Sequence, residues 1–327
     1  MDSNYGHCGE ITRYFYLDLN ETNVTQTLLV GSVFTCIVVN FTTSLTACFG
    51  NVLLVIAILT NTNLQSNGNY LIASLASVDF LVGFILQPLH AAYQLQFILG
   101  RSCSLFVAYR IIMLILVFLS LLNTLMVSCE RCLAVLFPTR YRAGLKKWKL
   151  FLPLGTLNLA WIVLICLQLC GVLNYDTIRL FASSTFICIT VIVAILYALM
   201  NRVSRRHRVQ IAAQHKASGK RNSLVKENRV FKTAVLVVTA LVICYLPISI
   251  VWFLDTTTTF EPKSKILYFM IVETLVYLNS TLNVLVYGCR SGEIRQSVMR
   301  ILRRRRFRRV QPSSDTNSYT IKSTKST

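Results

Sequence analysis

Long apolar runs alternate with short polar segments along the whole chain. Each run approaches or exceeds the ~20 residues that a helix needs to cross the hydrocarbon layer of a bilayer. Outer-membrane strands would be about half as long and would alternate in polarity, which these runs do not. The pattern predicts an all-α bundle of seven transmembrane helices. The expected spans are roughly 30–60, 69–92, 104–130, 150–173, 180–202, 230–254 and 266–289.

Composition supports a membrane protein. Hydrophobic residues make up 54% of the 327 residues and charged residues only 14%. Charged residues usually form about a quarter of a soluble domain. An ordinary globular fold could not hide this much apolar surface from water.

The net charge of +20 is unevenly placed. Six of the 33 basic residues, Arg110 among them, lie on one side of the expected spans, and 27 fall around 131–149, 202–232 and 290–325. Cytoplasmic loops carry the excess of basic residues, so the N-terminus is expected outside the cell and the C-terminus inside. Loops that face anionic lipid account for this charge, and no nucleic-acid partner is expected.

The N-terminal segment is expected to lie outside the cell. Residues 1–28 are interpreted as an extracellular segment without a cleavable signal peptide, with glycosylation sequons at Asn20 and Asn23. The transmembrane domain is expected over 29–290. The eleven cysteines include one CxxC pair, at 129 and 132, but no second pair that would complete a metal site.

The C-terminal part reads as membrane-associated. Over 291–309, apolar residues form a stripe among arginines, which predicts an amphipathic helix on the membrane surface in contact with lipid. Cys289 precedes it and is a candidate for palmitoylation. The Ser/Thr-rich residues 310–327 are expected to be a disordered cytoplasmic tail.

Several polar residues interrupt the apolar runs. Asp79 is a carboxylate near the bilayer centre, and Glu130-Arg131 ends the third span with a charge pair that needs a partner or a function. Pro88 and Pro247 predict kinks in the second and sixth spans. Other polar or aromatic residues within the spans are Gly50-Asn51, Trp161 and Tyr197. In the seventh span, Asn279, Asn283 and Tyr287 lie on one helix face.

In this order the motifs resemble the rhodopsin-like (class A) G protein-coupled receptors over essentially the whole chain. The resemblance implies a plasma-membrane receptor that binds an extracellular ligand and activates a heterotrimeric G protein, with arrestin and a receptor kinase acting on the tail. No enzymatic motif is present. The matching residues are Gly50-Asn51, Leu75-Ala76 with Asp79, Glu130-Arg131-Cys132, Trp161, Tyr197, Pro247, and Asn283-Val284 with Tyr287.

The resemblance implies a sodium site and no other cofactor. Hard oxygen ligands around one carboxylate suit a small cation. A hydrogen-bond network between helices without an ion is the alternative. The positions are Asp79, Ser120, Asn279, Ser280 and Asn283.

The resemblance also implies an activation switch at the cytoplasmic side. Arg131 and Glu227 match a charge lock between the third and sixth helices, which a G protein would replace. The alternative is a surface pair worth under ~1 kcal/mol. The residues expected to take part in coupling and activation are Glu130, Arg131, Cys132, Tyr197, Glu227, Tyr245, Pro247, Asn283 and Tyr287.

The chain departs from the family pattern in places. Val284 replaces the proline of the seventh helix, and Tyr245 replaces a tryptophan switch in the sixth. Cys103 could pair with Cys170 or Cys8, or remain a free thiol. A short second outer loop without cysteine and a fifth helix without proline resemble the melanocortin branch.

An upper pocket is expected to take a peptide or a small molecule. Met113 in place of an aspartate argues against an amine, and Tyr277 in place of a lysine argues against retinal. Arg110 and Glu273 either contact a charged ligand or neutralise each other. The lining is expected to comprise Gln87, His90, Tyr109, Arg110, Met113, Tyr245, Trp252, Glu273 and Tyr277.

Two other functions stay open. A seven-helix ion transporter or channel could use Asp79, Asn283 and Arg131 as an ion path, although no internal repeat supports it. A receptor-like decoy that no longer signals would fit the departures at Val284 and Tyr245. G-protein nucleotide exchange and ion flux distinguish these functions.

Overall fold

The structure is a computed structural model that describes residues 24–99, 103–142, 148–215, 223–257, 262–290 and 292–310. Within these ranges every regular element is helical. The expected glycosylation sites Asn20 and Asn23 and the tail from 311 onward lie outside the described residues.

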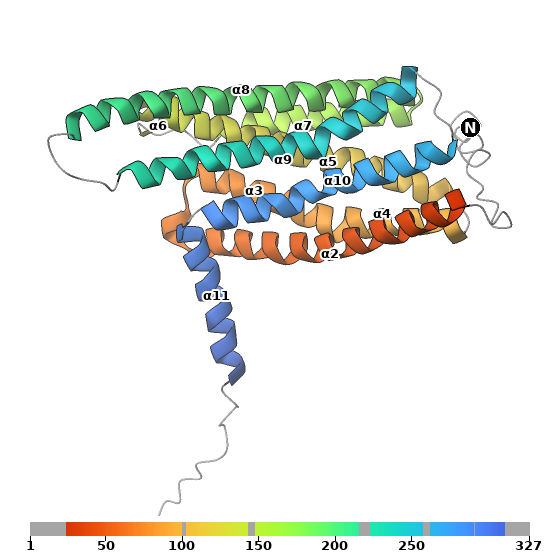
Figure 1. Ribbon diagram of the computed structural model, residues 1–327, viewed down its shortest axis with the longest axis horizontal. Helices are drawn as coiled ribbons and strands as arrows, with labels where there is room; N and C mark the ends of the chain where they lie inside the picture. The colour runs from red at the N-terminus through yellow and green to blue at the C-terminus, as the bar shows by residue number, and fades with distance from the viewer. Residues whose placement is uncertain are drawn as a thin grey trace, which may run out of the picture.

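Seven helical spans in the described residues are long and apolar enough to cross a membrane, as the sequence predicts. They lie side by side along one axis (Figure 1). The second span is made of three consecutive elements, α3, η2 and α4. The elements are α2 (Val24–Thr60), α3 (Asn67–Leu81), η2 (Val82–Leu86), α4 (Gln87–Leu99), α5 (Cys103–Leu136), α7 (Trp148–Leu169), α8 (Tyr175–His215), α9 (Ser223–Thr257) and α10 (Pro262–Arg290).

Burial separates central from peripheral helices. In the apolar stretch of α10, 61% of the residues are buried, whereas in that of α7 only 17% are. Helix α10 therefore packs on several neighbours, and α7 lies at the rim. A lipid-facing surface needs no polar residues, so both faces of α7 can be apolar.

The expected kink at Pro88 takes the form of a widened turn. Proline lacks an N–H and its ring crowds the carbonyl one turn earlier. The five residues of η2, just before Pro88, form a π-helix. The Ser44 hydroxyl donates to the Gly83 carbonyl at 2.7 Å, so α2 supplies a hydrogen bond within the widened turn.

The turn between α7 and α8 depends on Gly171. Its φ of 76° lies in the left-handed region that glycine adopts without strain. The Val172 N–H then donates to the Leu167 carbonyl, which ends α7 tightly. Cys170 in this turn is a free cysteine among the described residues. The side chain of Cys103 lies outside the described part of the chain, so its pairing stays a prediction.

Helix α11 (Gly292–Val310) follows α10 and turns across the bundle axis at the end where the short helix α6 (Pro138–Arg142) lies (Figure 1). Asn61, just before the 3-10 turn η1 (Thr62–Leu64), donates to the Ser297 hydroxyl at 2.7 Å. Ile294 is 2% exposed against the bundle. The first turns of α11 thus pack on the bundle, and the rest of the helix extends away from it (Figure 1).

Candidate functional site

Glu273 on α10 is the centre of a buried charge network near the end where α4 terminates. Arg110 Nη1 on α5 lies 2.5 Å from Glu273 Oε1. The Tyr109 hydroxyl donates to the other carboxylate oxygen at 2.6 Å. The Glu273 side chain is 3% exposed, and such a carboxylate is costly unless it is paired. The two charges of the predicted pocket therefore face each other.

Aromatic rings surround this carboxylate. The His90 imidazole stacks on Tyr109 with centroids 5.2 Å apart and meets the edge of Tyr277 at 5.0 Å. His90 Nε2 lies 3.4 Å from Glu273 Oε2. The hydroxyls of Tyr109 and Tyr277 are 2.6 Å apart. His90 thus belongs to an aromatic wall built from α4, α5 and α10, and neither of its ring nitrogens has a hydrogen-bond partner among the described residues.

One face of α4 carries polar groups with unused hydrogen-bonding capacity. Gln87, His90 and Gln94 follow at i, i+3 and i+7, and each is at most 1% exposed. Among the described residues, neither amide atom of Gln94 has a hydrogen-bond partner, nor has Oε1 of Gln87. Buried polar groups are normally hydrogen-bonded, so these atoms are candidates for contact with a ligand.

The remaining predicted pocket residues are also inside the bundle. Met113 on α5, Tyr245 and Trp252 on α9 are each at most 1% exposed. Trp252 Nε1 is a further buried donor without a hydrogen-bond acceptor among the described residues. Gln94 was missed from the sequence, although its spacing of four residues from His90 could have indicated it.

A second buried ion pair, also missed from the sequence, joins α8 to α9. Arg179 Nη1 lies 2.6 Å from Asp255 Oδ2 and 3.7 Å from Asp176 Oδ1. Its Nη2 donates to the Trp252 carbonyl at 3.3 Å. The ion pair therefore links α8 to α9 next to Trp252.

The Asp79 carboxylate accepts hydrogen bonds from three side chains in the middle of the bundle. The hydroxyls of Ser120 and Ser280 each donate to Oδ1 at 2.8 Å. The Asn283 amide donates to Oδ2 at 2.9 Å. Asn279, the fifth expected member, instead donates to the Tyr245 hydroxyl at 3.4 Å. Both serine oxygens and the carboxylate converge and suit a small hard cation.

Glu130 and Arg131 form a local cluster at the other end of α5. Arg131 Nε lies 3.4 Å from Glu130 Oε2, and its Nη2 donates to Asn69 at 3.4 Å. The Tyr141 hydroxyl on α6 donates to Glu130 Oε1. Burial and this hydrogen bond to Glu130 raise the pKa of Tyr141 to about 12. The sequence reading had not singled out Tyr141.

The other predicted switch residues are less fully defined. Cys132 and Tyr197 are 4% and 3% exposed. Pro247 lies inside α9 without ending it. Glu227, Tyr287 and Cys289 lie in helices, but their side chains are outside the described part of the chain. The lock between Arg131 and Glu227 therefore stays a prediction.

Seven membrane-length helices around buried polar clusters define a multi-pass membrane protein. A family model described as 7 transmembrane receptor (rhodopsin family) matches residues 50–287. The chain belongs to this rhodopsin family of receptors. The predicted class and fold are thereby confirmed, and the chain is a receptor and not an enzyme.

Curated relatives carry adenosine-receptor names. Adenosine receptor A2a of Homo sapiens is 24% identical over 314 residues, covering 84% of this chain and 74% of that receptor. Adenosine receptor A3 of Ovis aries is 26% identical over 322 residues, covering 86% and 93%. Family membership implies an extracellular ligand and a G protein as partners, and a plasma-membrane location. The resemblance to the melanocortin branch stays a prediction.

Proposed function

We propose that this chain binds a small polar ligand between α4, α5, α9 and α10 and transmits binding to a heterotrimeric G protein at the Arg131 end. The N-terminus faces outward and the basic end lies in the cytoplasm, as the charge distribution favours. The observation that carries this proposal is the set of buried side-chain polar atoms on α4 and α9 that have no hydrogen-bond partner among the described residues.

The proposed pocket favours a ligand with little net charge. Arg110 and Glu273 already neutralise each other at 2.5 Å, so a charged ligand would have to break that pair. Gln94 offers both a donor and an acceptor, and Trp252 Nε1 offers a donor.

Adenosine is the first ligand to test. The relatives' names associate those receptors with adenosine, and a nucleoside is an uncharged molecule with a planar base and several donors and acceptors. A peptide is the other ligand class suggested by the sequence. All the pocket groups are nearly buried, which favours the smaller molecule.

Pocket variants test the ligand assignment. Gln94→Leu removes both unsatisfied amide atoms and should weaken adenosine binding about tenfold, near the loss of one buried hydrogen bond. Gln96→Leu on the same helix is the matched control and should bind normally. Equal binding by the two variants, or binding only of peptides by the intact chain, would contradict the small-ligand proposal.

Tyr245 links the proposed ligand site to the centre of the bundle through a hydrogen bond. The residue lies on α9 between Trp252 and the cytoplasmic end, and its hydroxyl accepts from Asn279 on α10. Asn279 is adjacent to Ser280, which donates to Asp79. A ligand that prefers one arrangement of α9 and α10 would shift the population toward that arrangement.

The proposed response at the Arg131 end is release of its present partners. Arg131 is held by Glu130 and Asn69 at 3.4 Å each, which we take as the resting arrangement. Tyr197 and Tyr287 would turn inward when α9 moves away. The tail would then be the target of a receptor kinase and arrestin, with Cys289 palmitoylation and α11 contacts to anionic lipid holding the segment at the membrane.

Nucleotide exchange on purified G proteins in membranes tests signalling without a known ligand. Glu227→Ala should raise basal exchange, because it removes the proposed partner that restrains Arg131. Arg131→Ala should abolish exchange. If the intact chain and both variants match empty membranes across several G proteins, the signalling proposal fails and a decoy receptor replaces it.

A further inference from the structure

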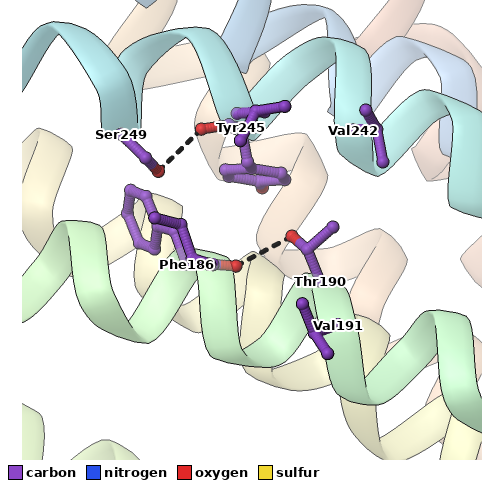
Figure 2. A pocket seen from close by; sticks show the side chains of 8 residues that line it. Phe186, Thr190, Val191, Val242, Tyr245 and Ser249 are labelled. Carbon is purple, nitrogen blue, oxygen red and sulfur yellow. Dashed lines mark hydrogen bonds between the residues drawn. The ribbon is translucent and has the colours of Figure 1, made fainter.

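A cavity of about 160 Å³ lies between α8 and α9, on the side away from the Asp79 cluster. Figure 2 shows Phe186 and Thr190 on α8 pointing toward Tyr245 and Ser249 on α9, and Val191 and Val242 also line the cavity. The cavity is distinct from the ligand site proposed around Glu273, and α9 contributes residues to both.

The cavity lies at the middle depth of the membrane. Thr190 is at the midpoint of the span Asp176–Val203, and Tyr245 is at the midpoint of the span Leu236–Asp255. Its rim faces outward, because Ile187, Val191 and Leu246 are 42%, 50% and 40% exposed. Within a bilayer, that exposed rim meets the terminal parts of lipid acyl chains.

The lining is chemically suited to hydrocarbon. The Thr190 hydroxyl donates to the Phe186 carbonyl at 2.8 Å, and the Ser249 hydroxyl donates to the Tyr245 carbonyl at 2.8 Å (Figure 2). Both hydroxyl protons are thus used within their own helices. A dry apolar cavity of about 150 Å³ can hold a benzene-sized group, so this cavity can hold on the order of six carbon atoms.

Tyr245 connects the cavity to the polar interior. Its ring forms part of the cavity wall and meets the edge of Phe186 with centroids 5.4 Å apart. Its hydroxyl, at the other end of the same rigid ring, accepts from Asn279 at 3.4 Å. A group that fills the cavity therefore supports the ring in the position that allows this contact.

We propose that the cavity binds the methyl end of a phospholipid acyl chain and that occupancy favours the resting arrangement of α8 and α9. The bilayer itself supplies this occupant at high concentration, so weak binding suffices for filling. Van der Waals contact with Phe186 and Tyr245 provides the attraction, since transfer from lipid to protein gains no hydrophobic energy. The regulatory half of this proposal rests on the proposed signalling function.

Occupancy is tested by photolabelling in nanodiscs. The intact chain is reconstituted with a phosphatidylcholine that carries a diazirine at the end of one acyl chain, and labelled peptides are mapped by mass spectrometry. Labelling at Ile187, Val191 and Leu246 should exceed that at other exposed residues at least threefold. Val242→Phe fills the cavity and should remove the excess, whereas Val163→Phe on α7 should leave it unchanged. Uniform labelling would overturn the site, and preferential labelling by a sterol probe alone would overturn the acyl-chain assignment.

Regulation is tested by basal nucleotide exchange of the same variants. The phenyl ring of Val242→Phe replaces the lipid chain, so exchange should fall about fivefold, at the low end of allosteric coupling. Val163→Phe should retain the exchange of the intact chain. An unchanged or raised rate in Val242→Phe would overturn the regulatory half. If no G protein responds to the intact chain, the signalling function fails, and the photolabelling still decides the site.

Discussion

Arg179 Nη1 lies 2.6 Å from Asp255 Oδ2, and their side chains are only 7% and 3% exposed. Removing one member of a buried ion pair leaves the other charge uncompensated, at a cost of about 3–5 kcal/mol. Asp255→Asn should therefore lower the thermal stability of the purified receptor substantially.

The neighbouring Asp176 provides the control for this ion pair. It lies 3.7 Å from Arg179 but is 66% exposed, so Asp176→Asn should cost less than ~1 kcal/mol. Equal melting temperatures for Asp255→Asn and Asp176→Asn would contradict a structural role of the buried pair.

Gly50 and Val284 pack too closely for a larger side chain. A Cβ at Gly50 would lie 2.5 Å from a Val284 methyl carbon. Gly50→Ala should cost about 1–3 kcal/mol through overpacking, and Val284→Ala should restore much of that loss. Thermal unfolding in detergent measures both effects.

Gly155 on α7 is the matched control for the contact between α2 and α10. No atom of the described residues lies within 4 Å of a Cβ built there. Gly155→Ala should therefore be neutral or stabilise the helix by roughly 0.5–1 kcal/mol. A destabilisation as large as that of Gly50→Ala would show that the loss does not come from the Val284 contact.

The Tyr141 phenol should titrate late because its pKa is raised to about 12 by burial and by the hydrogen bond to Glu130. An ordinary tyrosine has a pKa of about 10. The neutral phenol therefore contributes its stability fully below pH 10, and the contribution is lost as the pH rises through 12. In an ultraviolet titration of the folded receptor, Tyr141→Phe should show one phenol fewer ionising near pH 12 than the unaltered receptor.

The Glu130→Gln variant separates the contribution of Glu130 from that of burial to the raised pKa of Tyr141. It removes the negative charge but retains an acceptor, so the Tyr141 step should move toward lower pH without disappearing. A titration curve identical to that of the unaltered receptor would contradict a contribution from Glu130.

Sodium should stabilise the receptor if the Asp79 cluster binds the ion. The carboxylate and the hydroxyls of Ser120 and Ser280 converge within hydrogen-bonding distance. Melting in sodium chloride should exceed that in choline chloride at equal ionic strength, and Asp79→Asn should abolish the difference. Equal melting of the unaltered receptor in both salts would favour the hydrogen-bond network without an ion.

The sequence by itself determined the seven spans and their order. A helix that crosses a bilayer needs a fixed apolar length, which is a local property of the chain. The predicted first span, 30–60, and third span, 104–130, correspond to Val30–Thr60 and Ser104–Leu136. Asp79 could be singled out for the same reason, because an ionisable residue in such a run needs partners wherever the helix packs.

Only the tertiary structure decided which face of each helix turns inward. Lipid is as apolar as a protein core, so apolar patterning could not tell exposed Phe49 from buried Ala47 on the same helix. The pairing of Arg179 with Asp255 and the inward position of Gln94 depend on these rotations. The contact of Tyr141 with Glu130 likewise depends on where α6 folds back, which no local spacing encodes.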